Sequence, residues 1–155
     1  MSKHHPSFND FPCPLASFTA LGLNVEVPGL YMVYASDKAT ARHGDLLSFS
    51  VWIMNSTPET LTDVTVILRS LTNGEMERLE YTTQPHQDAL TGGTLGPVGA
   101  LNHILTYEVT LADANYGDTL ISALQVELIS PTRGKLVSEC DAHVLIRKPA
   151  LERKP

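Results

Sequence analysis

The chain has 155 residues, of which 43% are hydrophobic and 18% are charged, and its formal net charge is -6. This length is usual for one domain, and the apolar fraction is enough for a core without support from metals or many disulfides. A negative balance with few charged residues excludes a broad electrostatic footprint for nucleic acid. We therefore expect one compact domain that does not bind DNA or RNA.

Residues 1–28 show no regular period and contain several prolines, which predicts an extended N-terminal arm. Residues 1–18 hold no apolar run of the length that a signal peptide needs, so we expect no export signal. The arm carries more aromatic side chains than a disordered tail usually does. We predict that three of them insert into grooves of a partner: Phe8, Phe11 and Phe18.

From Gly29 onward, apolar and polar residues alternate with a period of two, which is the pattern of half-buried antiparallel strands. Polar residues interrupt every apolar run, so we expect no transmembrane helix and no contact with a membrane. The predicted strands are residues 30–36, 46–54, 62–71, 76–82, 104–111, 119–130 and 135–147.

The connections between these strands contain clear turn signals. Pro131 suits the first corner of a type I turn and Gly134 its left-handed closing position, which predicts a hairpin. A short helical turn is expected at residues 111–116. The pattern predicts an all-β fold, a single immunoglobulin-like antiparallel β-sandwich over residues 29–147, followed by a basic C-terminal tail at 148–155.

A longer series of strand and turn motifs runs through residues 44–146. Its members in chain order are Gly44-Asp45, Asn55, residues 61–66, residues 95–97, residues 105–110, Ala112-Asp113 and Gly117-Asp118. This series resembles a family of immunoglobulin-like repeat domains in bacterial and archaeal surface proteins and in some phage structural proteins. The resemblance implies the fold and a non-catalytic, cohesive role. Surface members usually stand in tandem behind a signal peptide, so a single copy without a signal favours a stand-alone structural subunit.

The loop at residues 113–118 places oxygen-bearing side chains at alternate positions, as a calcium loop does; they are Asp113, Asn115 and Asp118. It lacks the bidentate glutamate at its far end, and Asp, Asn and Gly are ordinary turn residues. We therefore predict a turn, with cation binding as the alternative. No histidines show the paired helical spacing of a zinc site, and we expect no metal and no cofactor.

Catalytic motifs are also missing from the sequence. No serine lies in a G-x-S-x-G elbow, and we assign Ser48 and Ser50 to the secondary face of a strand. Residues 91–96 are glycine-rich but lack the Lys-Ser/Thr of a phosphate-binding loop, which predicts a flexible crossover between sheets. We predict no catalytic residues and no enzymatic activity.

Two cysteines, Cys13 and Cys140, lack C-x-x-C spacing and are too few for a disulfide scaffold. Free thiols, with Cys140 packed as a small apolar residue, are the favoured interpretation. The alternative is one disulfide that ties the arm to the last strand.

Trp52 lies on the strand face opposite Phe49, where it either packs into the fold or forms an exposed partner contact. The tail residues Lys148, Arg153 and Lys154 are opposite in sign to the acidic body. They are either solvated or dock on an acidic neighbouring subunit.

These features predict a structural or binding module, specifically a decoration (cement) protein or other structural subunit of a phage or virus particle. It would be made in the host cytoplasm and would reside in the virion, as a homo-oligomer or bound to capsid or other assembly subunits. Such a protein stabilises an assembly because it binds the assembled state preferentially. The alternative is a cell-surface adhesin module that binds carbohydrate or protein.

Overall fold

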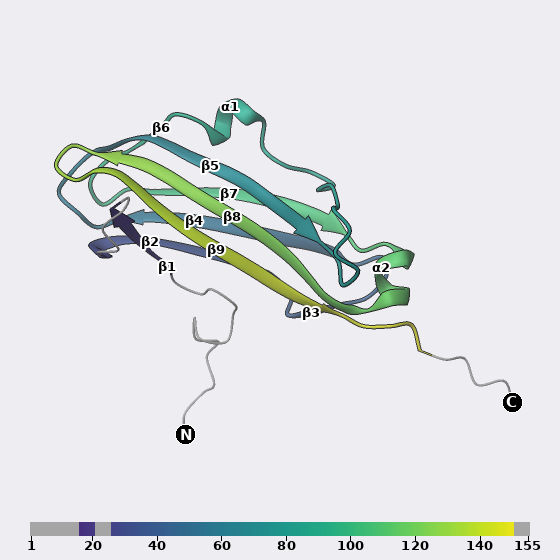
Figure 1. The fold of residues 1–155 in the computed structure, drawn as a ribbon. Coiled ribbons are helices and arrows are strands. Elements are labelled where there is room, and N and C mark those ends of the chain that lie inside the picture. Colours follow the sequence, from purple (N-terminus) through teal and green to yellow (C-terminus); the bar gives the residue numbers. More distant parts are fainter. Residues whose placement is uncertain (1–15, 21–25, 151–155) are drawn as a thin grey trace, which may run out of the picture.

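The computed structural model describes residues 16–20 and 26–150, which fold as strands and two short helices (Figure 1). Neither of these two helices has the length and hydropathy needed to cross a membrane. The elements in chain order are β1 (Ala16–Ala20), β2 (Glu26–Ser36), β3 (Thr40–Ala41), β4 (Leu46–Asn55), β5 (Leu61–Thr72), α1 (Gln87–Leu90), β6 (Gly93–Leu95), β7 (Ala100–Glu108), α2 (Leu111–Tyr116), β8 (Asp118–Ser130) and β9 (Gly134–Ile146).

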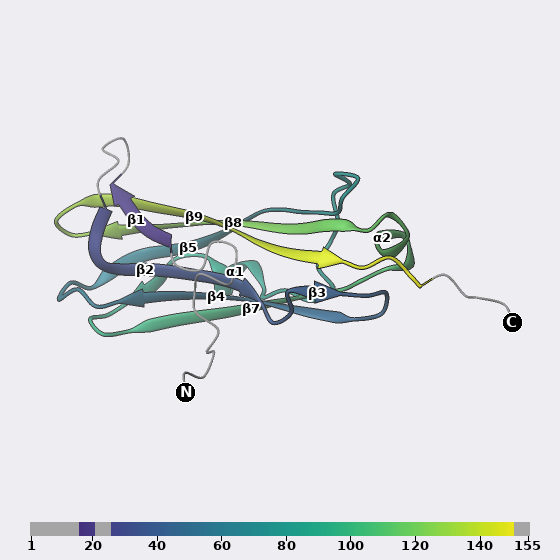
Figure 2. The ribbon, with the colours of Figure 1, turned by 90° about the horizontal axis from the view of Figure 1, so that it is seen from below.

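The strands form two packed layers, which Figure 2 shows edge-on, with β5, β8 and β9 in one layer and β2, β4 and β7 in the other. Hydrogen bonding connects the strands in the order β6-β5-β8-β9-β1-β2-β4-β7. Because β1 pairs with both β9 and β2, it joins the two layers along one side. β3 adds a short parallel pairing to β9. The prediction of an all-β sandwich is confirmed.

Alternation along the strands places the core where the sequence predicts it. On β4, the inward row of four large apolar side chains is fully buried: Leu47, Phe49, Val51 and Ile53. The ring of Phe49 lies 6.0 Å from that of Tyr34 and 6.4 Å from that of Tyr81, measured between centroids. Both tyrosine hydroxyls form hydrogen bonds with Ser122 Oγ of β8, so a polar contact links the two layers inside the core.

Part of the predicted arm belongs to the sandwich. Residues 16–20 form β1, and β2 begins at Glu26, before the predicted boundary at residue 29. Phe18 is 0% exposed and packs in the core, so its assignment as a partner contact is wrong. An aromatic side chain on a strand that closes the sandwich gains more by burial than by exposure to water. Phe8 and Phe11 lie outside the described residues.

Three local predictions between the strands need correction. Residues 76–82 form no strand and contribute only an isolated bridge between Arg78 and Thr72. The glycine-rich segment is not a flexible crossover, because β6 pairs with β5 there. Leu111, the last residue of the predicted strand 104–111, instead begins α2 and is 51% exposed, because the Thr110 side chain caps this helix.

Other local predictions are confirmed. Residues 111–116 form the expected helical turn, α2. Gly134 has a φ of 74° and closes the tight connection between β8 and β9, the left-handed conformation that glycine adopts without steric cost. The predicted hairpin is therefore confirmed, and it connects the two longest strands.

The prediction of a free thiol is wrong at Cys140, which is 3% exposed on β9 and is disulfide-bonded. A disulfide depends on which cysteines the fold brings within bonding distance, and composition does not contain that information. Cys13 lies outside the described residues.

Candidate interaction surface

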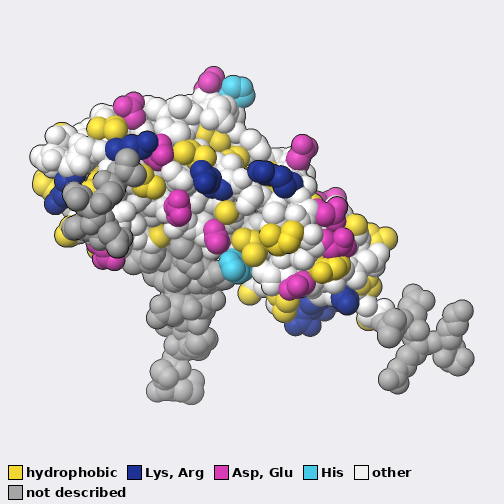
Figure 3. Space-filling model, in the orientation of Figure 1, with side chains coloured by type: hydrophobic (Ala, Val, Ile, Leu, Met, Phe, Trp, Pro, Cys, Tyr) yellow, Lys and Arg dark blue, Asp and Glu magenta, His cyan; other side chains and the backbone are white. Residues whose placement is uncertain are grey.

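The two layers present outer faces of different chemistry. The outer face of the β5, β8 and β9 layer carries charged groups, and Figure 3 shows acidic, basic and histidine side chains scattered among hydrophobic ones. Glu127 and Lys135 form an ion pair there at 3.2 Å, and Asp141 and His143 are exposed on β9. A face of this kind is well solvated and costly to cover.

The opposite face, formed by the outward side chains of β2, β4 and β7, carries no charge along its centre. Trp52 is 45% exposed in the middle of β4, directly opposite Val33 of β2 and Asn102 of β7. Ile104 lies on β7 two residues beyond Asn102, diagonally across from Trp52, and is 50% exposed. We call this surface the Trp52 face and define it by Tyr31, Val33, Trp52, Met54, Asn102 and Ile104.

The Trp52 face has the properties of a docking surface. Contiguous exposed apolar side chains mark interaction sites, and tryptophan is enriched among the residues that dominate binding energy. The amide of Asn102 already donates to Val51 O at 3.1 Å, so the polar member of the face has a partner within the fold. The interpretation that Trp52 packs into the fold is wrong, because its side chain is exposed on the outer face of β4.

Ile104 is a member that sequence reasoning missed, although the sequence contained a signal for it. The predicted strand at 104–111 places Leu105 and Tyr107 inward, so strict alternation puts Ile104 outward. A large apolar residue at an outward position next to an exposed tryptophan would have identified the same face.

The predicted tail residue Lys148 is not part of this face. It is exposed and follows β9, whose end lies beside α2 (Figure 1). A Cβ placed on Gly117 would lie 2.9 Å from Lys148 Cγ, so the aliphatic stem of the lysine packs against that glycine. Arg153 and Lys154 lie outside the described residues.

The oxygen-bearing residues of the predicted turn at 113–118 lie in different surroundings. Asp113 is 1% exposed, and its carboxylate accepts hydrogen bonds from Tyr107 Oη, the Thr110 backbone N–H and Asn73 Nδ2. Asn115 and Asp118 are exposed. Over residues 16–20 and 26–150, no three His, Cys, Asp or Glu side chains are grouped as metal ligands.

Asp113 has a structural role instead. It is the third residue of α2 and forms a capping box with Thr110. Burial opposes ionisation of this carboxyl, but hydrogen bonds from Tyr107, Thr110 and Asn73 outweigh it and lower the pKa of Asp113 below its ordinary value. The spacing of Thr110 and Asp113 was the signal in the sequence for this cap.

The arrangement of the two layers is that of an immunoglobulin-like antiparallel β-sandwich. A solved structure of the ASH/PapD-like domain of human CEP192 (PapD-like domain 7) is similar, with a TM-score of 0.50 and 11% identity. The match covers 86% of this chain and 96% of that chain, and it confirms the predicted fold class.

Two further solved structures are more distant. The structural genomics target SoR45 has a TM-score of 0.43 at 10% identity, over 91% of this chain and 90% of that one. The sporulation control protein Spo0M of Bacillus subtilis has a TM-score of 0.38 at 14% identity, over 81% of this chain and 51% of that one. No protein-family model and no curated protein matches the sequence.

Proposed function

We propose that this chain is a non-catalytic binding module that docks onto a protein through the Trp52 face. The observation that carries the proposal is a tryptophan 45% exposed at the centre of an uncharged sheet face, with Ile104 50% exposed beside it. Covering this face removes apolar surface from water without desolvating any charge. Covering the outer face of the other layer would also desolvate its charged side chains.

We propose a multisubunit particle as the setting, with the chain as a decoration or other structural subunit of a phage or virus. The resemblance of residues 44–146 to repeat domains of phage structural proteins supports this setting. An uncharged, apolar face also suits a long-lived contact between subunits, because obligate interfaces are more apolar than transient ones.

A photo-crosslinking amino acid introduced in place of Trp52 or Ile104, one at a time, tests the proposal in the cells that produce the protein. We expect both probes to capture the same protein, identified by mass spectrometry, whether a second copy of this chain or another subunit. A probe at His143, exposed on the charged face, serves as the matched control and is expected not to capture it. Equal capture at all three positions, or none at 52 and 104, would contradict the proposal.

With the captured protein purified, Trp52→Ala is expected to raise the dissociation constant about 30-fold or more, since a hot-spot tryptophan contributes about 2 kcal/mol or more. Leu145→Ala is the control, because Leu145 is 49% exposed on the other layer. Isothermal titration calorimetry measures both. A capsid or particle protein as the captured partner would support the proposed setting.

A further inference from the structure

A pocket of about 340 Å³ lies at the end of the sandwich where β9 ends, away from the Trp52 face. Its polar lining is basic and comes from two segments, the turn between β3 and β4 and the residues after β9. Leu111 of α2 and Pro149 supply apolar lining. We define the basic pocket by Arg42, His43, Leu111, Arg147, Lys148 and Pro149.

Among residues 16–20 and 26–150, no acidic side chain forms an ion pair with a cation of the basic pocket. The ion pairs among the described residues are Lys38–Asp37, His86–Asp88 and Lys135–Glu127, and none involves the pocket. The chain has a net charge of -6, whereas Arg42, Arg147 and Lys148 give this pocket a locally positive lining. A concave surface of one sign concentrates the field and attracts groups of the opposite charge.

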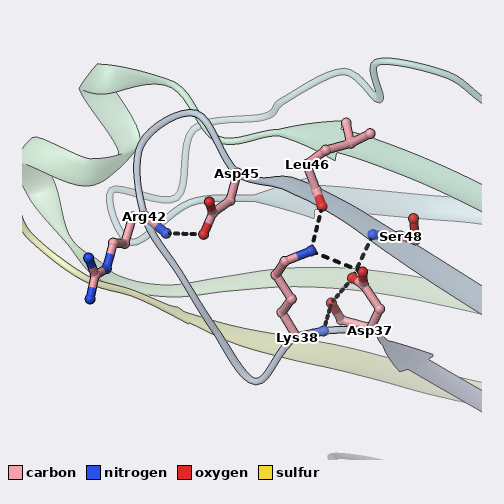
Figure 4. Close-up of polar contacts among 7 residues, drawn as sticks. Asp37, Lys38, Arg42, Asp45, Leu46 and Ser48 are labelled. Carbon is pink, nitrogen blue, oxygen red and sulfur yellow. Dashed lines mark hydrogen bonds and ion pairs between the residues drawn. The ribbon is translucent and has the colours of Figure 1, made fainter.

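Backbone hydrogen bonds hold the two basic segments in place. β3 pairs with the end of β9, and Arg147 N donates to Ala41 O at 2.8 Å. Asp45 closes the turn between β3 and β4, because its carboxylate accepts a hydrogen bond from the backbone N–H of Arg42 at 2.9 Å. Figure 4 shows the Arg42 guanidinium pointing away from that carboxylate, which leaves it available to a ligand.

A second hydrogen-bond network joins the connection between β2 and β3 to the start of β4, and it supports the turn between β3 and β4. Asp37 accepts from Ser48 N at 2.9 Å and from Lys38 Nζ at 3.0 Å, and the lysine also donates to Leu46 O (Figure 4). A site that is already ordered loses less conformational entropy when it binds a ligand. The basic pocket is therefore a formed feature of the fold.

We propose that the basic pocket binds an acidic peptide segment of a protein, in which carboxylates flank an apolar side chain. Arginine guanidinium groups bind carboxylates in a bidentate manner, and Arg42 and Arg147 come from separate segments that can each hold one. The apolar lining by Leu111 and Pro149 accommodates a hydrocarbon side chain, which a free inorganic anion lacks. The contact differs in place and chemistry from the Trp52 face and does not depend on it.

Fluorescence anisotropy with a labelled peptide of alternating Glu and Leu residues tests this site. We expect saturable binding that weakens as ionic strength rises, and no binding of the matched peptide with Gln in place of every Glu. The double variant R42Q/R147Q is expected to lose at least tenfold in affinity. Arg133→Gln, in the hairpin between β8 and β9, is the control and is expected to bind as the native protein does.

Four results would overturn the proposal. They are absence of binding by the Glu-Leu peptide, equal binding of the Gln peptide, an equal loss in R133Q, and competition by inorganic phosphate at concentrations comparable to those of the peptide. Thermal unfolding of the variants shows whether they remain folded, and the exposed positions of these arginines predict that they do. Trp52→Ala is expected to leave peptide binding unchanged. A result that contradicts one of the two proposed binding surfaces therefore does not contradict the other.

Discussion

Replacing Phe49 with alanine is expected to lower the free energy of unfolding by about 3–5 kcal/mol, the usual cost of deleting a buried aromatic ring. Phe49 is 0% exposed and its ring contacts those of Tyr34 and Tyr81. Its strand lies between β2 and β7, so the cavity would open at the centre of one layer, where neighbouring strands cannot close around it. Urea denaturation measures the loss, and the melting temperature should fall by about 10 °C.

Trp52, three residues further along the same strand, is the matched control. Its ring is 45% exposed on the outer face, so Trp52→Ala is expected to change the free energy of unfolding by less than about 1 kcal/mol. A loss at Trp52 as large as that at Phe49 would show that the outer ring supports the fold, and the Trp52 face would then lose its assignment as a docking surface.

Replacing Asp113 with asparagine is expected to cost about 2–4 kcal/mol at neutral pH, since each buried polar group left unpaired costs about 1–3 kcal/mol. Three donors reach this carboxylate, from Tyr107, Thr110 and Asn73. An asparagine has one acceptor oxygen with two lone pairs, and its amide would face at least one of these donors. The capping interaction at the start of α2 is weakened at the same time.

The difference between the native protein and D113N should depend on pH. The pKa of Asp113 is lowered in the folded protein, so its ionised form stabilises the fold at pH values above about 4, the ordinary value for this residue. This contribution is lost as the pH falls through the lowered folded pKa. Urea denaturation at pH 7 and at successively lower pH values should show the two proteins converging.

Asp88→Asn is the control for this prediction, because the Asp88 side chain is 93% exposed and its pairing with His86 contributes little. It should leave stability unchanged at neutral pH. A constant difference between D113N and the native protein over the whole acid range would mean that shape, and not charge, accounts for the role of Asp113.

The sequence predicted the strands best where one face is buried and the other solvated. Period-two alternation identified the inward row of β4 and the body of β8 and β9, and Pro131 with Gly134 identified their connection. It failed at residues 76–82, where apolar and polar residues alternate but pairing is limited to one bridge at Arg78. Alternation is necessary for a half-buried strand, but a strand also needs a neighbour with free hydrogen-bonding groups.

The sequence predicted Trp52 and Lys148 as contact residues because of their residue types. It did not show which side chains surround them. The neighbours of Trp52 come from β2 and β7, which are far apart in the chain, so only strand pairing shows that the face around it is uncharged. The same holds for Arg42 and Arg147, which the parallel pairing of β3 with β9 brings together.

By itself, the sequence determined the fold class, the inward rows of the main strands and the hairpin at residues 130–134, because these follow from local periodicity and backbone preference. Only the tertiary structure decided that Phe18 is buried in a strand joining the layers, that the Asp113 carboxylate is buried with Tyr107 and Asn73 as hydrogen-bond partners, and that Cys140 is oxidised. Each of these outcomes depends on contacts between distant segments, whose free energies no local pattern encodes.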